Sequence, residues 1–173
     1  MNPTLETLKT RRSCRKYLAR PVEEETLCAI LEAGMYAPTG KNRMAPKMVV
    51  VRDKETIAAL SRMNAAVMGT ENDPFYGAPT LIIVFADREV PTYVEDGALV
   101  MGNLMNAAHA LGVDSCWIHR ARQVFETEEG RRLMKKWGIG ENYAGIGNCI
   151  LGYRDGEHPE ASPRKEEIGR AHV

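Results

Sequence analysis

The sequence predicts a mixed α/β sandwich in which helices cover both faces of a sheet. Segments whose apolar residues follow helical spacing alternate along the chain with short, β-branched segments, and one strand-like segment is apolar throughout. The 173 residues are long enough to bury one sizeable core, and no repeat or linker divides them. We therefore expect a single domain over residues 1–173.

The first half of the chain supplies a helix, a strand and a second helix. Residues 22–36 show helical spacing, with a run of three glutamates at a position that suits a helix N-terminus. Residues 47–51 (KMVVV) are short and β-branched, which predicts a strand. Helical spacing returns in residues 54–68.

The second half begins with the most apolar segment, residues 79–86 (PTLIIVFA), which predicts a central strand buried on both faces. Residues 93–111 are apolar or small around most of a helix, so that helix must be enclosed by its own domain or by a partner subunit. Residues 113–118 predict a strand, Thr127 the N-cap of a helix to about Trp137, and residues 144–153 a last strand.

Composition narrows the function classes. The 23 basic residues balance the 23 acidic ones, which argues against nucleic-acid partners. The longest apolar runs are about half the roughly 20 residues of a membrane-spanning helix, so no membrane partner is expected. The four cysteines form no CxxC pair and the chain opens without signal-peptide features, which predicts a cytoplasmic protein.

A basic cluster, residues 11–17 (RRSCRKY), follows the predicted first helix. Its guanidinium groups and serine hydroxyl can hold a phosphate through charge-assisted hydrogen bonds. The alternative is a solvated basic run, which is favourable at a helix C-terminus.

A second candidate site is the segment of residues 37–46 (APTGKNRMAP), which offers an amide, a hydroxyl and two cations between a helix and a strand. The alternative there is an ordinary turn-rich connection.

The third candidate site contains Cys116 and His119, which lie close in sequence and could suggest a thiol nucleophile with a histidine base. Side chains three apart on a strand point to opposite faces, so a core cysteine and a histidine at a pocket rim are the better interpretation. No set of residues with metal-ligand spacing accompanies them. Phosphate-binding and dinucleotide glycine motifs are also missing, since Gly145-Ile146-Gly147 lacks a third glycine.

Five segments, in order along nearly the whole chain, resemble the nitroreductase family. RRSCRKY resembles its phosphate-binding stretch R-R-S-x-R-x-[FY], and APTGKNRMAP its loop APS-x-x-N-x-Q-P. DPFYGAPTLIIVFAD resembles its central strand, VEDGALVMGNLMNAAHALGVDSCWI its core helix and following strand, and ILGY with SPRKE its closing strand and tail. Met44 departs from the family by replacing glutamine, so a thioether stands where an amide could donate a hydrogen bond.

The resemblance implies an α+β fold, a three-layer α/β/α sandwich with a mixed, mainly antiparallel sheet. It also implies an intertwined homodimer with one FMN in each of two interface pockets, in which the tail Glu166 to Val173 is exchanged between subunits. The apolar helix over residues 93–111 would then pack at the dimer core.

Carried over by motif, the cofactor-binding residues fall into three groups. The phosphate, ribityl chain and pyrimidine edge would be bound by Arg11, Arg12, Ser13 and Arg15, with Arg164 reaching the phosphate. The isoalloxazine would be lined from the partner subunit by Pro38, Thr39, Gly40 and Asn42. A third group would face the isoalloxazine largely through backbone groups: Trp117, Ile118 and His119.

The implied activity is an FMN-dependent oxidoreductase that transfers hydride from NADH or NADPH to a nitroaromatic, quinone or flavin acceptor by a ping-pong mechanism. No catalytic residue is assigned, because the cofactor carries the chemistry, and water, His119 or Lys41 could supply protons. Two alternatives remain: a flavin-binding redox sensor without turnover, and a dehalogenating or flavin-fragmenting branch. The second would need a substrate-gripping lid, which the sequence lacks between Asp87 and Asp96.

Overall fold

The computed structural model describes residues 2–165, so the predicted exchange of the tail Glu166 to Val173 lies outside the described residues. Six α-helices, one short 3₁₀ turn (η1) and four strands follow one another within the described range. Their order is α1 (Pro3–Thr10), α2 (Glu24–Met35), η1 (Gly40–Asn42), β1 (Lys47–Val51), α3 (Lys54–Met68), β2 (Thr80–Asp87), α4 (Tyr93–Ala110), β3 (Asp114–Ile118), α5 (Ala121–Glu126), α6 (Glu128–Lys136) and β4 (Tyr143–Gly152).

The four strands form one sheet in the order β1-β2-β4-β3, and each neighbouring pair is antiparallel. The last strand of the described residues, β4, is therefore inserted between β2 and β3. The parallel part of the predicted mixed sheet is limited, within the described residues, to one isolated bridge between Ser13 and Ser115.

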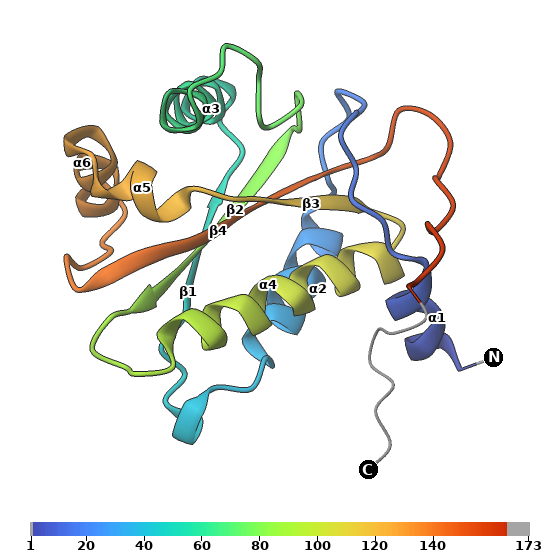
Figure 1. Cartoon of the computed structure of the whole chain (residues 1–173), viewed down its shortest axis with the longest axis horizontal. Helices are drawn as coiled ribbons and strands as arrows, with labels where there is room; N and C mark the ends of the chain where they lie inside the picture. The colour runs from blue at the N-terminus through green and yellow to red at the C-terminus, as the bar shows by residue number, and fades with distance from the viewer. Residues whose placement is uncertain (1, 166–173) are drawn as a thin grey trace.

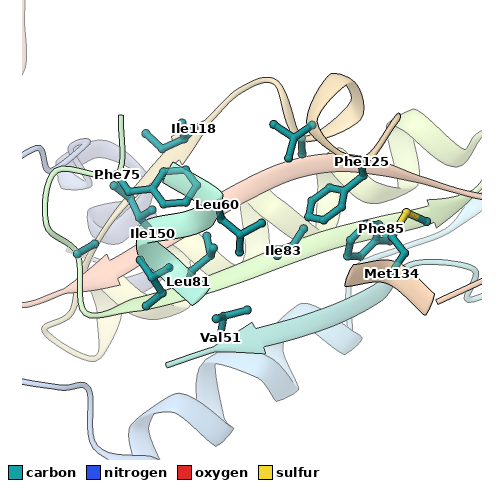
Figure 2. Close-up of a cluster of buried hydrophobic side chains, with 14 of the residues drawn as sticks. Val51, Leu60, Phe75, Leu81, Ile83, Phe85, Ile118, Phe125, Met134 and Ile150 are labelled. Carbon is teal, nitrogen blue, oxygen red and sulfur yellow. The ribbon is translucent and has the colours of Figure 1, made fainter. Parts of the chain in front are cut away.

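Helices cover both faces of this sheet, which confirms the predicted three layers (Figure 1). Alternate side chains of β2 point to opposite faces. Leu81, Ile83 and Phe85 join the core beneath α3, α5 and α6, part of which Figure 2 shows. The residues between them join the core beneath α2 and α4. The prediction that this strand is central and buried on both faces is also confirmed.

Helix α4 is enclosed on one side only by the described chain. Met101, Leu104 and Ala108 are fully buried against β2 and β4. Gly97 lies so close to β4 that an added Cβ would overlap Ile146. In contrast, Leu99 is 47% exposed, so part of the apolar circumference has no cover within the described residues.

The segment after β3 forms two short helices, α5 and α6, of which the sequence pattern predicted only α6. Thr127 caps α6 as predicted, because its Oγ1 accepts a hydrogen bond from the Gly130 backbone N–H at 3.0 Å. The preceding helix α5 has only six residues and begins after Arg120, whose φ of 81° is unusual for a residue other than glycine. Among the described residues, no helix combines the length and the apolar character needed to cross a bilayer.

Candidate functional site

The basic cluster lies where α1 ends and an extended segment joins the edge of the sheet. Arg11 is the C-cap of α1, and its backbone N–H donates to the Thr7 carbonyl at 3.0 Å. Three residues later, the fully buried Cys14 donates its backbone N–H to the Ser115 carbonyl at 2.9 Å. Residues 11–13 are thereby held beside the start of β3.

Several buried polar atoms of this region have no hydrogen-bond partner among residues 2–165. They include Arg11 Nη1, Arg12 Nε and Ser115 Oγ. The other nitrogens of Arg12 donate to two backbone carbonyls, those of Arg11 at 2.5 Å and Lys9 at 2.7 Å. Buried polar groups are nearly always paired in folded proteins, so these unpaired donors mark a place where an anion would be stabilised.

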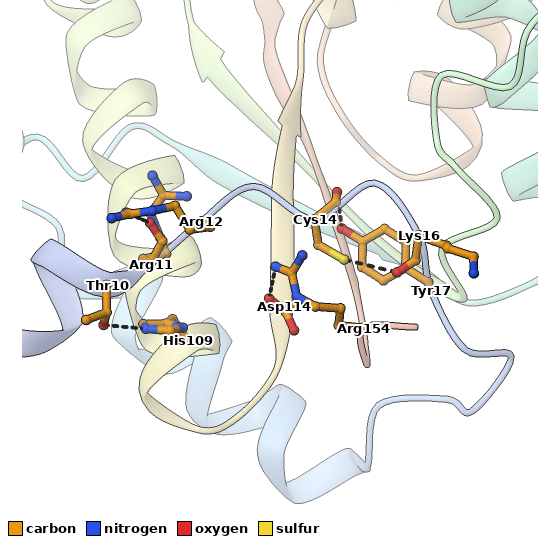
Figure 3. Close-up of polar contacts among 9 residues, drawn as sticks. All are labelled: Thr10, Arg11, Arg12, Cys14, Lys16, Tyr17, His109, Asp114 and Arg154. Carbon is orange, nitrogen blue, oxygen red and sulfur yellow. Dashed lines mark hydrogen bonds and ion pairs between the residues drawn. The ribbon is translucent and has the colours of Figure 1, made fainter. Parts of the chain in front are cut away.

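His109, in the last turn of α4, contacts the same region (Figure 3). The Thr10 hydroxyl donates to the Glu6 carbonyl at 2.8 Å, so the 2.8 Å contact between Thr10 Oγ1 and His109 Nε2 must have the imidazole as donor. The His158 ring lies 5.5 Å away, centroid to centroid. Burial lowers the pKa of His109, and the nearby charges of His158, Arg11 and Arg12 lower it further, against an opposing effect of Asp114.

An ion pair ties the segment after β4 to β3. Arg154 donates to Asp114 at 2.5 Å, and their side chains are only 13% and 16% exposed. Tyr17, which bridges to Arg154, donates its hydroxyl to the Cys14 carbonyl at 2.9 Å. The start of β3, the basic cluster and the C-terminal coil therefore form one connected polar region.

A cavity of about 240 Å³ opens at the other end of β3. Two of the predicted site residues, Trp117 and His119, line it. Ile118 does not, because its side chain points into the core beneath α3 and α5. The cavity is lined by Val94, Ala98, Trp117, His119, Arg120, Arg122, Gln123, Gly145 and Ile146.

Cys116 and Cys149 are poorly suited to nucleophilic chemistry, which for Cys116 agrees with the interpretation from strand geometry. Burial raises the pKa of Cys116, and it raises the pKa of Cys149 to about 12. Cys116 packs in the core, whereas His119 is exposed at the cavity. Within residues 2–165, no cluster of three or more His, Cys, Asp or Glu side chains could hold a metal ion.

The loop with Pro38, Thr39, Gly40 and Asn42 lies at the opposite end of α4 from the basic cluster. The Gly40 backbone N–H donates to Asp96 Oδ1 at 2.9 Å, in the first turn of α4. Helix α4 has 18 residues, which corresponds to about 27 Å. One chain therefore does not bring this loop together with Arg11, Arg12 and Ser13.

The remaining predicted residues are exposed. Arg15 points away from the core, and Arg164 lies in the coil after β4, with no hydrogen bond or ion pair to any described residue. Asp96, Arg120 and Arg122 were missed by sequence reasoning. Asp96 is distinguished by its contact with Gly40, and Arg120 by its left-handed backbone. Neither feature has a local sequence signal. Gly145 and Ile146 were noticed only as an incomplete dinucleotide motif.

Comparison with known proteins gives a consistent result. The family model described as the nitroreductase family matches residues 8–155. A protein from Archaeoglobus fulgidus, named as an NADH dehydrogenase/NAD(P)H nitroreductase, is 32% identical over 159 residues, or 88% of this chain and 86% of that protein.

Solved structures also resemble the chain over its length, and two examples are nitroreductases with bound FMN. A nitroreductase with bound FMN from Bacteroides fragilis has a TM-score of 0.87 and 29% identity, and the match covers 100% of this chain and 99% of that one. A nitroreductase with bound FMN from Desulfitobacterium hafniense also has a TM-score of 0.87, with 28% identity over 99% of this chain and 100% of that one.

The lowered pKa of His109 predicts a loss of stability in mild acid. The unfolded chain binds a proton on this imidazole more readily than the folded chain, so stability is lost as the pH falls from about 6.5 through the folded pKa. We expect the free energy of unfolding in urea to decrease over this range. His109→Gln, whose amide can still donate to Thr10, should flatten the decrease. An unchanged pH dependence in that variant would contradict the assignment.

Proposed function

Because this chain belongs to the nitroreductase family, we propose that it is an FMN-dependent oxidoreductase that takes electrons from NADH or NADPH. Residues 1–173 would form a single nitroreductase-like FMN-binding domain. The observation that carries the proposal is the set of unpaired buried donors on Arg11 and Arg12, which match the phosphate of the flavin. The likeness to nitroreductases with bound FMN supports the same cofactor.

The residues at the basic cluster fit a flavin phosphate. A phosphate carries close to two negative charges near neutral pH, and guanidinium forks match its oxygens in charge and shape. Arg11, Arg12, Ser13 and Arg15 would hold the phosphate, ribityl chain and pyrimidine edge. Arg164 would reach the phosphate from the C-terminal coil. The unpaired Ser115 hydroxyl, buried beside Ser13, adds one more group to this set.

The isoalloxazine would lie at the other end of β3. Trp117, Ile118 and His119 would face it largely through backbone groups, which agrees with the Ile118 side chain pointing away into the core. The second set of ring contacts, from Pro38, Thr39, Gly40 and Asn42, would come from a partner subunit. The length of α4 supports this arrangement, because it keeps the loop of one chain away from the basic cluster of the same chain.

When bound, FMN would supply the two-electron chemistry, and the protein would bind and orient it. The cavity of about 240 Å³ is below the usual size of a small-molecule site, so beside the flavin ring it would not hold donor and acceptor at once, and they would reach the ring in turn. This limited space supports a ping-pong order. The lining includes Arg120 and Arg122 and no carboxylate, so it would attract the phosphates of NADH or NADPH.

The acceptor would be a small oxidant such as a nitroaromatic, a quinone or a free flavin. Only residues 88–92 connect β2 to α4, so this connection provides no lid that would grip one particular substrate. The short connection disfavours the dehalogenating and flavin-fragmenting branches. His119 at the cavity, Lys41 of the partner subunit, or water would deliver protons to the acceptor.

Met44 has an exposed side chain and a backbone N–H that donates to Thr39 Oγ1 at 3.0 Å. Its thioether offers no hydrogen-bond donor to a substrate or to the flavin edge. The substitution of methionine for the common glutamine should therefore change substrate contacts more than FMN binding.

The four free cysteines are compatible with a reducing compartment, and we propose a cytoplasmic location.

The visible spectrum of the purified protein tests the function. We expect bound FMN, identified by chromatography after release, and loss of its absorbance when NADH or NADPH is added without oxygen. A bound flavin that stays oxidised with both donors would favour the redox sensor. A colourless protein that cannot be reconstituted with FMN would reject the proposal.

Arg11→Met should weaken FMN binding about 10- to 100-fold, because a charge-assisted hydrogen bond contributes roughly 1.5–3 kcal/mol. Riboflavin, which lacks the phosphate, should bind the variant and the wild type equally. Lys16→Met is the matched control, since Lys16 is exposed in the same segment and pairs with Asp155 at 2.8 Å. Equal loss of FMN and riboflavin affinity would contradict the phosphate assignment. Fluorescence quenching during titration measures both ligands.

The exposed apolar residues of α1 and α4 support the homodimer. Leu5 and Leu8 of α1 are 51% and 55% exposed, and Leu99 of α4 is 47% exposed. We expect Leu99→Glu to shift the protein from dimer to monomer and to reduce FMN affinity, because a charge buried at the interface is strongly unfavourable. Light scattering after size-exclusion chromatography measures the mass. Leu18→Glu, in the coil before α2, should leave the mass unchanged, and a monomeric wild type would reject the homodimer.

A further inference from the structure

Asp96 is a buried carboxylate that links two segments far apart in the sequence. It lies in the first turn of α4 and is only 2% exposed. Its Oδ1 accepts a hydrogen bond from the Gly40 backbone N–H at 2.9 Å, and its Oδ2 accepts one from the Thr92 hydroxyl at 3.1 Å. The amino end of α4 is a favourable environment for this negative charge.

The loop attached to Asp96 has an unusual backbone. Lys41, Asn42 and Met44 have φ values of 53°, 54° and 50°, a left-handed conformation that is unfavourable for residues other than glycine. Such conformations persist only where surrounding contacts impose them. Besides the one to Asp96, the described hydrogen bonds of this loop lie within residues 39–44.

Close packing also fixes the place where the loop meets α4. A Cβ added to Gly40 would overlap the Thr92 hydroxyl, so glycine is required at the point of contact. The Thr92 hydroxyl in turn donates to Asp96. Asp96, Thr92 and Gly40 therefore form one connected unit, which we call the loop anchor.

We propose that Asp96 is a positioning residue that, through the loop anchor, holds residues 39–44 in the conformation that presents Asn42 to the flavin. The proposal rests on the proposed function, in which this loop lines the FMN ring of the partner subunit. Asp96 does not itself touch the cofactor. Asp96 acts on the flavin through the Gly40 backbone N–H. The residues that follow Gly40 with a left-handed backbone are Lys41, Asn42 and Met44.

Two substitutions separate the hydrogen bonds of Asp96 from its charge. Asp96→Ala removes both acceptors. Asp96→Asn keeps an oxygen for the Gly40 N–H and offers an N–H to the Thr92 hydroxyl, so it should restore most of the function. Asp53→Ala is the matched control, because Asp53 also accepts two hydrogen bonds, from the backbone N–H and hydroxyl of Thr56, at the exposed N-terminus of α3.

Limited trypsin digestion of the FMN-free protein tests the loop anchor without the cofactor. Lys41 and Arg43 are exposed trypsin sites within the loop. Loss of a hydrogen bond to a charged acceptor should accelerate cleavage after these residues about tenfold in Asp96→Ala. Asp96→Asn and Asp53→Ala should be cleaved there at the wild-type rate. Circular dichroism checks that each variant is folded, and Thr92→Val serves as the test variant if Asp96→Ala is not.

FMN titration then tests the link to the cofactor. Asp96→Ala should bind FMN about tenfold more weakly, with a shifted absorbance maximum of the bound flavin, while Asp96→Asn and Asp53→Ala stay close to the wild type. Faster cleavage with unchanged FMN affinity and spectrum would overturn the positioning role, and so would unchanged cleavage. A wild type that binds no FMN would overturn the proposed function and the flavin part of this proposal, whereas the trypsin rates would still decide whether the loop anchor exists.

Discussion

Strands β2 and β4 occupy the middle of the sheet, where helices cover both of their faces, and this double burial constrains the rest of the structure. A strand that is apolar on both sides must be sandwiched between layers, so α2 and α4 have to pack on one face and α3, α5 and α6 on the other. The edges of the sheet are left to β1 and β3. The basic cluster, the ion pair between Arg154 and Asp114, and the cavity lie along β3, where the apolar core ends.

Edge strand β3 connects two chemically different regions. Its first residue, Asp114, pairs with Arg154 beside the basic cluster, and the cavity opens just beyond its last residue, Ile118. Helix α4 runs alongside and places His109 near the cluster and Asp96 near the loop. The core therefore fixes the separation between the basic cluster and the cavity.

The sequence predicts the local elements well, because helical and strand periodicities depend on neighbouring residues. The central strand and the Thr127 cap are examples. Contacts between distant segments leave no such pattern: nothing in APTGKNRMAP or in α4 indicates that Gly40 would meet Asp96, 56 residues away. The left-handed Arg120 is equally invisible, since arginine carries no preference for that conformation. The cofactor residues came from family resemblance, and their roles remain predictions.

Helix α4 makes a long-range polar contact at each end, and this limits how the chain can vary in evolution. Inserting or deleting one residue in its middle would rotate one end by about 100° relative to the other and displace it by about 1.5 Å. His109 and Asp96 could then no longer both meet their partners, even if the inserted residue were apolar and well packed. Length polymorphism should therefore be tolerated in the surface connections of this protein and selected against within α4.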